Sequence, residues 1–230
     1  MRKALRPALI ATIPVMTGYL VLGFGFGIML LDAGGDLPLA LGMSAFIYAG
    51  SMQYVAIDLL TGGAPLITLA LTTLMVNARH LFYGVSMLEK YRGMGAAKPY
   101  MVFALTDETY SLVCQEPLPV PPESRRAYCL LVSLFDHLWW VSGTLLGAAV
   151  GTLLQLDTAG VDFALTALFV TVFIEQWLTA ADRVPALVGV GASVACLLLF
   201  GPDGFLIPAM LVIALLLCLY TQDRGGTEHV

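Results

Sequence analysis

The chain has 230 residues, of which 59% are apolar and 12% are charged, and its mean hydropathy is +0.86. A soluble domain of this length cannot cover so much hydrocarbon, since charged residues make up about 25% of ordinary soluble domains. The formal net charge of −5 argues against nucleic acid as a partner, because phosphates require a basic surface. The composition therefore predicts a protein embedded in a lipid bilayer.

Apolar stretches predict an all-α fold, a polytopic transmembrane bundle that forms one domain over residues 1–230. Most of the stretches approach the roughly 20 residues that a helix needs to cross a bilayer. There are eight, at about 8–31, 38–60, 64–88, 100–114, 129–154, 161–180, 184–201 and 204–221. The first follows a basic segment, as the core of a signal peptide would, but it exceeds the roughly 7 to 15 residues of such a core. We therefore expect it to remain as the first span.

Lysine and arginine collect in loops on the cytoplasmic side of membrane proteins. If all eight stretches cross, the loop with Lys90, Arg92 and Lys98 falls on the wrong side. A re-entrant segment at 38–60 and a non-crossing segment at 100–114 would correct this, and irregular backbone is tolerated at membrane depth where it lines a cavity. We expect eight helical segments with broken or re-entrant helices among them, and seven or eight crossings.

A weak internal similarity suggests two halves, 8–114 and 129–221. Gly23-x-Gly25-x-Gly27 corresponds to Gly143-x-x-x-Gly147-x-x-x-Gly151, and later matches keep an offset of roughly 120 residues. A duplicated half would place a substrate site between the two copies. The alternative is that apolar helices simply resemble one another.

Two stretches carry candidate substrate-binding residues, which are Gly50, Ser51, Gln53, Tyr54, Asn77 and Arg79. The first four are spaced along one helix face, where small residues admit a ligand and an amide both donates and accepts. Arg79, if enclosed, needs an anionic partner, either a carboxylate of the protein or that of a substrate. Alternatively, Gly50 and Ser51 only mediate helix packing, and Arg79 only forms a structural ion pair.

Ionisable residues at bilayer depth cost at least a few kcal/mol, so they are expected to face one another or a hydrated cavity. The candidates for proton coupling are His80, Asp107, Glu108, Asp136 and Glu175. Asp107 and Glu108 are expected in the middle of the fourth helix. Trp139 and Trp140 could instead mark the membrane interface, which would place Asp136 near a surface.

Several motifs together resemble the AzlC family, the large subunits of bacterial branched-chain amino acid exporters. They are Gly50-Ser51-x-Gln53 after a glycine-rich span, Asn77-x-Arg79-His80-x-x-Tyr83-Gly84, Thr106-Asp107-Glu108 and Asp162-Phe163-Ala164. The resemblance runs from about residue 8 to 173. It implies a multi-pass permease of the bacterial inner membrane that exports branched-chain and related small apolar amino acids, draws on the proton gradient, and acts with a small AzlD-type subunit of about four helices.

The residues thus favour a secondary transporter with alternating access and without enzymatic activity, cofactor or metal. In this hypothesis Arg79 receives the substrate carboxylate, Gln53 and Asn77 orient its amino group, and Asp107 exchanges protons with His80. One alternative is an ion channel or a scaffold subunit. Another is an intramembrane hydrolase whose metal ligands would come from His80, His137 and an aspartate, although His-Glu-x-x-His is missing from the sequence.

Overall fold

The computed structural model of the chain describes residues 2–77, 79–115, 117–153, 182–202 and 204–225, together with 163, 170, 173, 174, 177 and 178. All regular structure in these residues is helical, which confirms the predicted all-α class. The chain divides into two compact units, Met1–Leu165 and Thr166–Val230.

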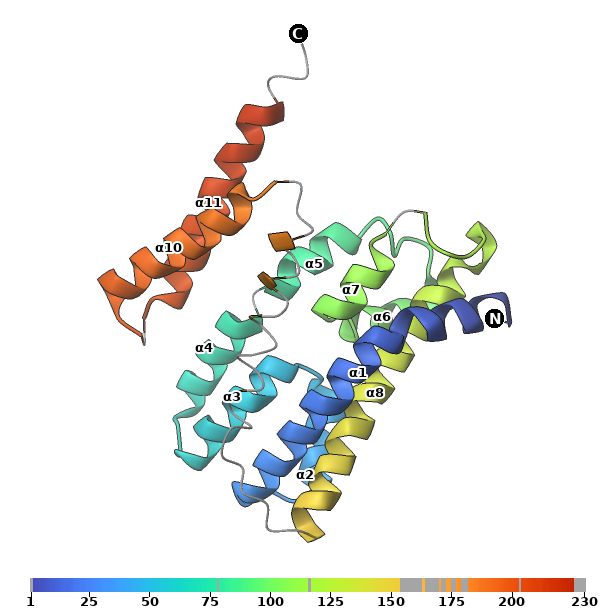
Figure 1. Cartoon of the computed structure of the whole chain (residues 1–230), viewed down its shortest axis with the longest axis horizontal. Coiled ribbons are helices and arrows are strands. Elements are labelled where there is room, and N and C mark those ends of the chain that lie inside the picture. The colour runs from blue at the N-terminus through green and yellow to red at the C-terminus, as the bar shows by residue number, and fades with distance from the viewer. Residues whose placement is uncertain are drawn as a thin grey trace. The chain divides into compact units, whose positions relative to one another are not determined.

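The first unit contains two long helices and several short ones (Figure 1). The α-helices are α1 (Arg2–Asp32), α2 (Leu37–Gly42), α3 (Gly50–Thr61), α4 (Leu66–Asn77), α5 (Arg79–Met87), α6 (Lys98–Phe103), α7 (Asp107–Val113) and α8 (Arg125–Leu153). A π-helical turn, Met43–Ile47, follows α2, and 3-10 turns, Gly95–Ala97 and Pro122–Ser124, precede α6 and α8. In the described part of the chain, the helical stretches Lys3–Asp32 and Pro122–Leu153 are long and apolar enough to cross a membrane.

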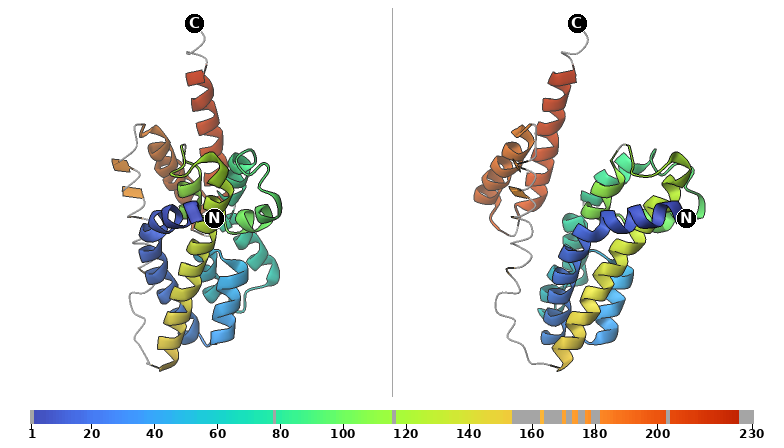
Figure 2. Two further views of the ribbon diagram at one scale, coloured as in Figure 1. Left: turned by 90° about the vertical axis from the view of Figure 1, so that its right-hand side faces the viewer. Right: turned by 45° about the vertical axis from the view of Figure 1, so that its right-hand side comes forward.

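α1 and α8 lie side by side along their length, as the two views of Figure 2 show. Glycines make the close approach possible. A Cβ atom on Gly23 would lie 2.8 Å from the Trp140 carbonyl oxygen, and one on Gly143 would lie 2.7 Å from that of Tyr19. Further along, Gly151 faces Ile28 and Leu31. Because contacts advance in the same direction on both helices, α1 and α8 run parallel, and their glycines form a small-residue interface that lets the backbones meet.

Stretch 38–60 contains two helical pieces rather than the single helix that its apolar pattern suggests. Asp36 caps α2 by accepting a hydrogen bond from the Leu39 amide (2.8 Å). The π-turn then ends at Tyr48, whose φ of 47° is left-handed, so the backbone cannot continue as a right-handed helix. α3 begins two residues later.

The two pieces form a hairpin that lies along α8. In the first piece, Ser44 donates a hydrogen bond to Thr144 of α8 (2.8 Å), and Tyr48, at the end of this piece, packs on the ring of His137 of α8 (4.3 Å between centroids). These two positions on α8 are about 10 Å apart at 1.5 Å per residue. α3 then runs back toward the end where α1 stops, as its contacts with α1 at Leu22 and Phe26 show.

Stretch 64–88 consists of α4 and α5, and α5 ends near the start of α1. There Met87, Tyr91 and Met94 share a buried core with Ala4 and Ala8.

Stretch 100–114 is also interrupted, so the expectation that Asp107 and Glu108 lie in the middle of a helix is wrong. α6 ends at Phe103, and Thr106 caps a new helix by accepting a hydrogen bond from the Thr109 amide (3.3 Å). α7 returns to the end where α6 started, because the carbonyl of Cys114 accepts a hydrogen bond from Lys90. With six and seven residues, α6 and α7 are about 9 and 10 Å long.

Basic loops gather at the end where α1 begins, which we call the basic end. Lys3 pairs with Glu123 (3.7 Å), and the Arg126 guanidinium lies against Gly95. The loop with Lys90 therefore lies beside the start of α1 and the start of α8 (Figure 1).

The second unit contains α10 (Val184–Phe200) and α11 (Leu206–Gly225), which pack on each other. Asp182 accepts hydrogen bonds from the Val184 amide and the Tyr220 hydroxyl (2.7 Å) and so fixes the entry to α10. Most of the predicted segment 161–180 lies outside the described residues.

Candidate functional site

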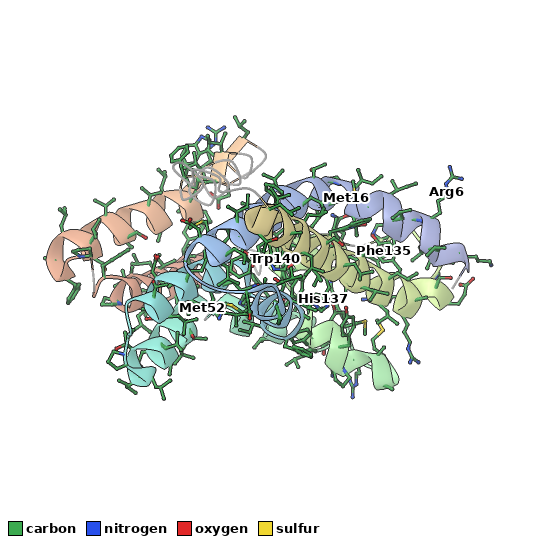
Figure 3. The ribbon with its side chains drawn as sticks, turned by 90° about the horizontal axis from the view of Figure 1, so that it is seen from below. Arg6, Met16, Met52, Phe135, His137 and Trp140 are labelled. Carbon is green, nitrogen blue, oxygen red and sulfur yellow. The ribbon has the colours of Figure 1, made fainter. Side chains whose placement is uncertain are left out.

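Polar side chains collect in the interior of the first unit, between α1, α8 and the turns of the two hairpins. The fully buried ones at this level are Ser44, Gln53, Thr109, Asp136 and Thr144. Figure 3 shows His137 and Trp140 along the middle of α8, away from the end of α1 at which Arg6 extends. A buried polar group costs free energy unless it is hydrogen-bonded, so each of these side chains is expected to have a hydrogen-bond partner. We call these five residues, together with the adjoining Tyr19, Tyr48 and Glu108, the polar centre.

Gln53 holds α3 to α8 through both ends of its amide. Its nitrogen donates to Ser44 (3.1 Å), which in turn donates to Thr144 (2.8 Å), and its oxygen accepts from the indole of Trp140 (3.0 Å). Gly50, one turn earlier, lies under the Trp140 ring, where a Cβ atom would be 3.0 Å away. The amide that we expected at the substrate is thus engaged by protein partners on both sides.

A chain of hydroxyl groups connects two carboxylic acids from different helices. Tyr19 donates to Glu108 (2.6 Å) and lies 2.7 Å from the Thr106 hydroxyl. Thr106 contacts Thr109 (3.2 Å), and Thr109 donates to Asp136 Oδ2 (2.8 Å). The chain therefore leads from Glu108 at the start of α7 to Asp136 within α8.

Aromatic rings line the polar centre. Tyr19 meets Trp140 edge to face (5.5 Å between centroids), and Tyr48 lies over His137. His137 is held at both ring nitrogens, by the Tyr100 hydroxyl (3.0 Å) and the Ser44 carbonyl (3.3 Å). The turns of the two hairpins meet here, since Tyr48 lies 6.2 Å from Phe103 between ring centroids.

Two buried oxygen atoms of the polar centre lack a hydrogen bond of normal geometry to any described residue. They are Asp136 Oδ1 and the Tyr48 hydroxyl, which lies near Tyr19 and within electrostatic range of Asp136 and Glu108. In the described part of the chain, neither Asp136 nor Glu108 forms an ion pair with a lysine or arginine. Asp136 is fully buried and Trp140 is 4% exposed, so both side chains face the interior of the first unit. The alternative in which Trp139 and Trp140 mark the membrane interface stays a prediction.

The remaining predicted residues are placed as follows. Tyr54 is buried and donates to the Leu22 carbonyl (2.6 Å), Ser51 is half-buried on α3, and Asp107 is half-buried at the start of α7. Asn77 ends α4, and its carbonyl lies 3.1 Å from His80 Nδ1 on α5. The side chain of Arg79 and the whole of Glu175 lie outside the described residues.

The structure brings Gln53, Glu108 and Asp136 into one polar centre, whereas His80 belongs to a neighbouring row of rings. His80 packs on Tyr83 (5.9 Å), and Tyr83 stacks on Tyr110 of α7 (4.9 Å). The expected proton exchange between His80 and Asp107 stays a prediction.

Sequence reasoning missed five residues of the polar centre, namely Tyr19, Ser44, Tyr48, Thr109 and Thr144. Tyr19, Ser44 and Tyr48 are isolated hydroxyls in apolar stretches, a pattern that indicates nothing by itself. Thr109 and Thr144 carried a signal, because Thr109 directly follows Asp107 and Glu108, and Thr144 follows Gly143 in the glycine series that faces α1.

A groove lies within the second unit. It has a volume of about 590 Å³ and is mostly apolar, with Phe173, Trp177 and Val190 in its wall. None of the described residues in its wall is a predicted site residue.

Interrupted helices that surround a buried polar centre, in a chain of this hydropathy, define a helical membrane protein. Residues 14–154 match the family model described as AzlC protein, and the chain belongs to this family. The family resemblance read from the motifs is thereby confirmed. No solved structure matches the chain.

Relatives in several bacteria carry related descriptions. The branched-chain amino acid transport protein AzlC of Bacillus subtilis (strain 168) is 43% identical over 91% of this chain and 82% of its own length. An uncharacterized membrane protein of Helicobacter pylori (strain ATCC 700392 / 26695) is 39% identical over 96% of both chains. The inner membrane protein YgaZ of Escherichia coli (strain K12) is 27% identical over 81% of this chain and 77% of its own.

Proposed function

We propose that the protein is a secondary-active permease that exports branched-chain and related small apolar amino acids across the bacterial inner membrane. The observation that carries the proposal is the 43% identity, over 91% of the chain, to a protein named for branched-chain amino acid transport. A buried polar centre in an apolar chain suits the passage of a zwitterion. The sequence has no Gly-x-x-x-x-Gly-Lys-Ser/Thr motif for ATP, which favours ion-driven transport.

In the proposed topology, α1, the α4–α5 pair and α8 cross the bilayer, and the hairpins α2–α3 and α6–α7 enter from opposite sides. None of the helices in the hairpins exceeds 12 residues, about 18 Å, whereas the hydrocarbon core is about 30 Å thick. With 161–180, α10 and α11 also crossing, the total is six, fewer than the seven or eight expected. This topology supports an orientation in which the loop of Lys90, the start of α1, Arg183 and Arg224 are all cytoplasmic, in agreement with the positive-inside rule.

The hydroxyl chain supports proton coupling. Glu108 and Asp136 are carboxylic acids that exchange protons through Tyr19, Thr106 and Thr109, since each hydroxyl both donates and accepts. Discontinuous helices that meet at the membrane midplane are typical of secondary transporters with alternating access. Asp107, His80 and Glu175 complete the proposed set of coupling residues, and Arg79 is proposed to receive the substrate carboxylate.

A small AzlD-type subunit of about four helices is the proposed partner, and the apolar surface of α10 and α11 is its proposed contact. Leu198 and Leu199 on α10 are about four-fifths exposed within the unit, as are neighbouring apolar side chains to a lesser degree. Such a surface requires lipid or another helix.

Counterflow of labelled leucine in proteoliposomes tests the proposal. Vesicles that contain this chain and the small subunit should accumulate label against internal unlabelled leucine, and an imposed pH gradient should drive net flux. An absence of accumulation with and without the gradient would refute the transporter. Single-molecule currents in place of slow counterflow would indicate a channel.

A further inference from the structure

The polar centre contains one carboxylate oxygen with no hydrogen bond to a described residue and one hydroxyl with no hydrogen bond of normal geometry. Asp136 is fully buried, its Oδ2 accepts from Thr109, and its Oδ1 has no hydrogen bond. The Tyr48 hydroxyl, on a side chain that is 4% exposed, lies near the Tyr19 hydroxyl without a hydrogen bond of normal geometry, and it is within electrostatic range of Asp136. Leaving such groups unsatisfied is costly, so a ligand that donates several hydrogen bonds is favoured at this place.

The charges and rings of the polar centre select the sign of that ligand. Glu108 lies at the other end of the hydroxyl chain and adds a second acid, while no described lysine or arginine pairs with either acid. The rings of Tyr19, Tyr48 and Trp140 present π-systems, which attract cations. An anionic group would be repelled here, whereas a primary ammonium group offers a positive charge and three N–H donors.

Gln53 is poorly suited to bind this end of the substrate. Its oxygen is occupied by Trp140, and its nitrogen donates to Ser44. Its place in the structure makes it a positioning residue, which fixes Trp140 beside Gly50.

We infer that Asp136, with the Tyr48 hydroxyl, binds the α-ammonium group of the amino acid substrate. This assignment rests on the proposed function and extends it by orienting the substrate, with its ammonium group toward α8. It requires that every substrate carry an amino group, and that recognition of this group be independent of the substrate carboxylate. Asp136 is thereby a binding residue in addition to any part that it takes in proton coupling.

Equilibrium binding to the purified, detergent-solubilised protein at one fixed pH tests the assignment without any gradient. Labelled leucine is competed with isoamylamine, which is leucine without its carboxylate, and with isocaproate, which is leucine without its amino group. In the wild type, isoamylamine should compete. In Asp136→Asn, the affinity for leucine and for isoamylamine should fall roughly 10- to 100-fold, as expected for the loss of a charge-assisted hydrogen bond, while the affinity for isocaproate stays unchanged or rises.

Tyr48→Phe serves as the second variant, since it keeps the ring on His137 and removes only the hydroxyl. It should weaken isoamylamine by a smaller factor and leave isocaproate unaffected, and it keeps the assignment testable if Asp136→Asn does not fold. If isoamylamine competes equally well in a folded Asp136→Asn, the assignment is overturned; if only Tyr48→Phe folds, unchanged competition in that variant overturns it. A second outcome would also overturn it: leucine binding that depends on sodium in the wild type and, in Asp136→Asn, keeps its affinity but no longer depends on sodium.

Failure of the proposed function gives a different result. Direct binding of labelled isoamylamine that depends on Asp136, in a wild type that binds no leucine, would support the ammonium site and contradict amino acid transport. A wild type that binds neither compound would overturn both.

Discussion

The contact between α1 and α8 should tolerate no side chain at Gly143. A Cβ atom there would lie 2.7 Å from the Tyr19 carbonyl oxygen, 2.8 Å from that of Leu20 and 3.0 Å from the Leu20 Cα atom. All three are backbone atoms, so no rotamer change can relieve the overlap. Reaching the 3.4 Å at which ordinary contact begins requires the helices to separate. Overpacking of this kind costs typically about 1–3 kcal/mol.

Gly18 provides the matched control, because it lies inside the long helix α1, as Gly143 lies inside α8, and a Cβ atom there would meet nothing within 4 Å. Thermal unfolding in detergent, followed by size-exclusion chromatography of the two Gly→Ala variants, measures the difference. Gly143→Ala should unfold at a lower temperature than the wild type, whereas Gly18→Ala should match or exceed the wild type, since alanine is the better helix former. Equal stability of the two variants would refute the parallel, backbone-to-backbone packing described here.

Three further predictions concern topology, coupling and the polar centre. In a cysteine-free background, Arg92→Cys should be labelled from the cytoplasmic side and Asp36→Cys from the outside by an impermeant maleimide, and labelling from one side would contradict the hairpin arrangement. Asp107→Asn should abolish pH-driven flux while sparing leucine exchange in proteoliposomes, and if both survive, Asp107 is not a coupling residue. Gln53→Ala should lower the unfolding free energy by about 1–3 kcal/mol, because Trp140 and Ser44 lose their partner. Thr17→Ala, which removes an exposed hydroxyl, should have little effect on thermal stability, and an equal loss in both would remove the case for Gln53 as a positioning residue.

Apolar length and turn chemistry were enough to predict the long elements. α1 and α8 match the stretches 8–31 and 129–154 closely, because a helix in an apolar medium satisfies its own backbone and needs no partner to be recognised. The breaks at Tyr48 and Ala104 were not located. Neither break contains a proline, and the left-handed turn at Tyr48 is held by a ring contact with His137, 89 residues later in the chain.

The candidate site was likewise predicted in part. Carboxylates in apolar stretches were recognisable because their burial is costly wherever they lie, and the structure places Glu108 and Asp136 on one hydroxyl chain. The hydroxyls of Tyr19, Ser44 and Thr144 cost little individually and depend on the fold for their role. The glycine series that suggested a repeat proved to be the interface between α1 and α8, while the two-half repeat itself stays a prediction.

Leucine counterflow in proteoliposomes, measured on two glycine variants, tests most directly whether the polar centre is the route of the substrate. Gly50→Val would fill the space under Trp140, where even a Cβ atom lies 3.0 Å from the ring, whereas Gly42→Val adds its side chain where nothing lies within 4 Å. Counterflow per mole of folded protein should be lost in Gly50→Val, whose folded yield should fall because the Trp140 ring has to move, and retained in Gly42→Val. Full counterflow in a folded Gly50→Val would contradict passage through the polar centre.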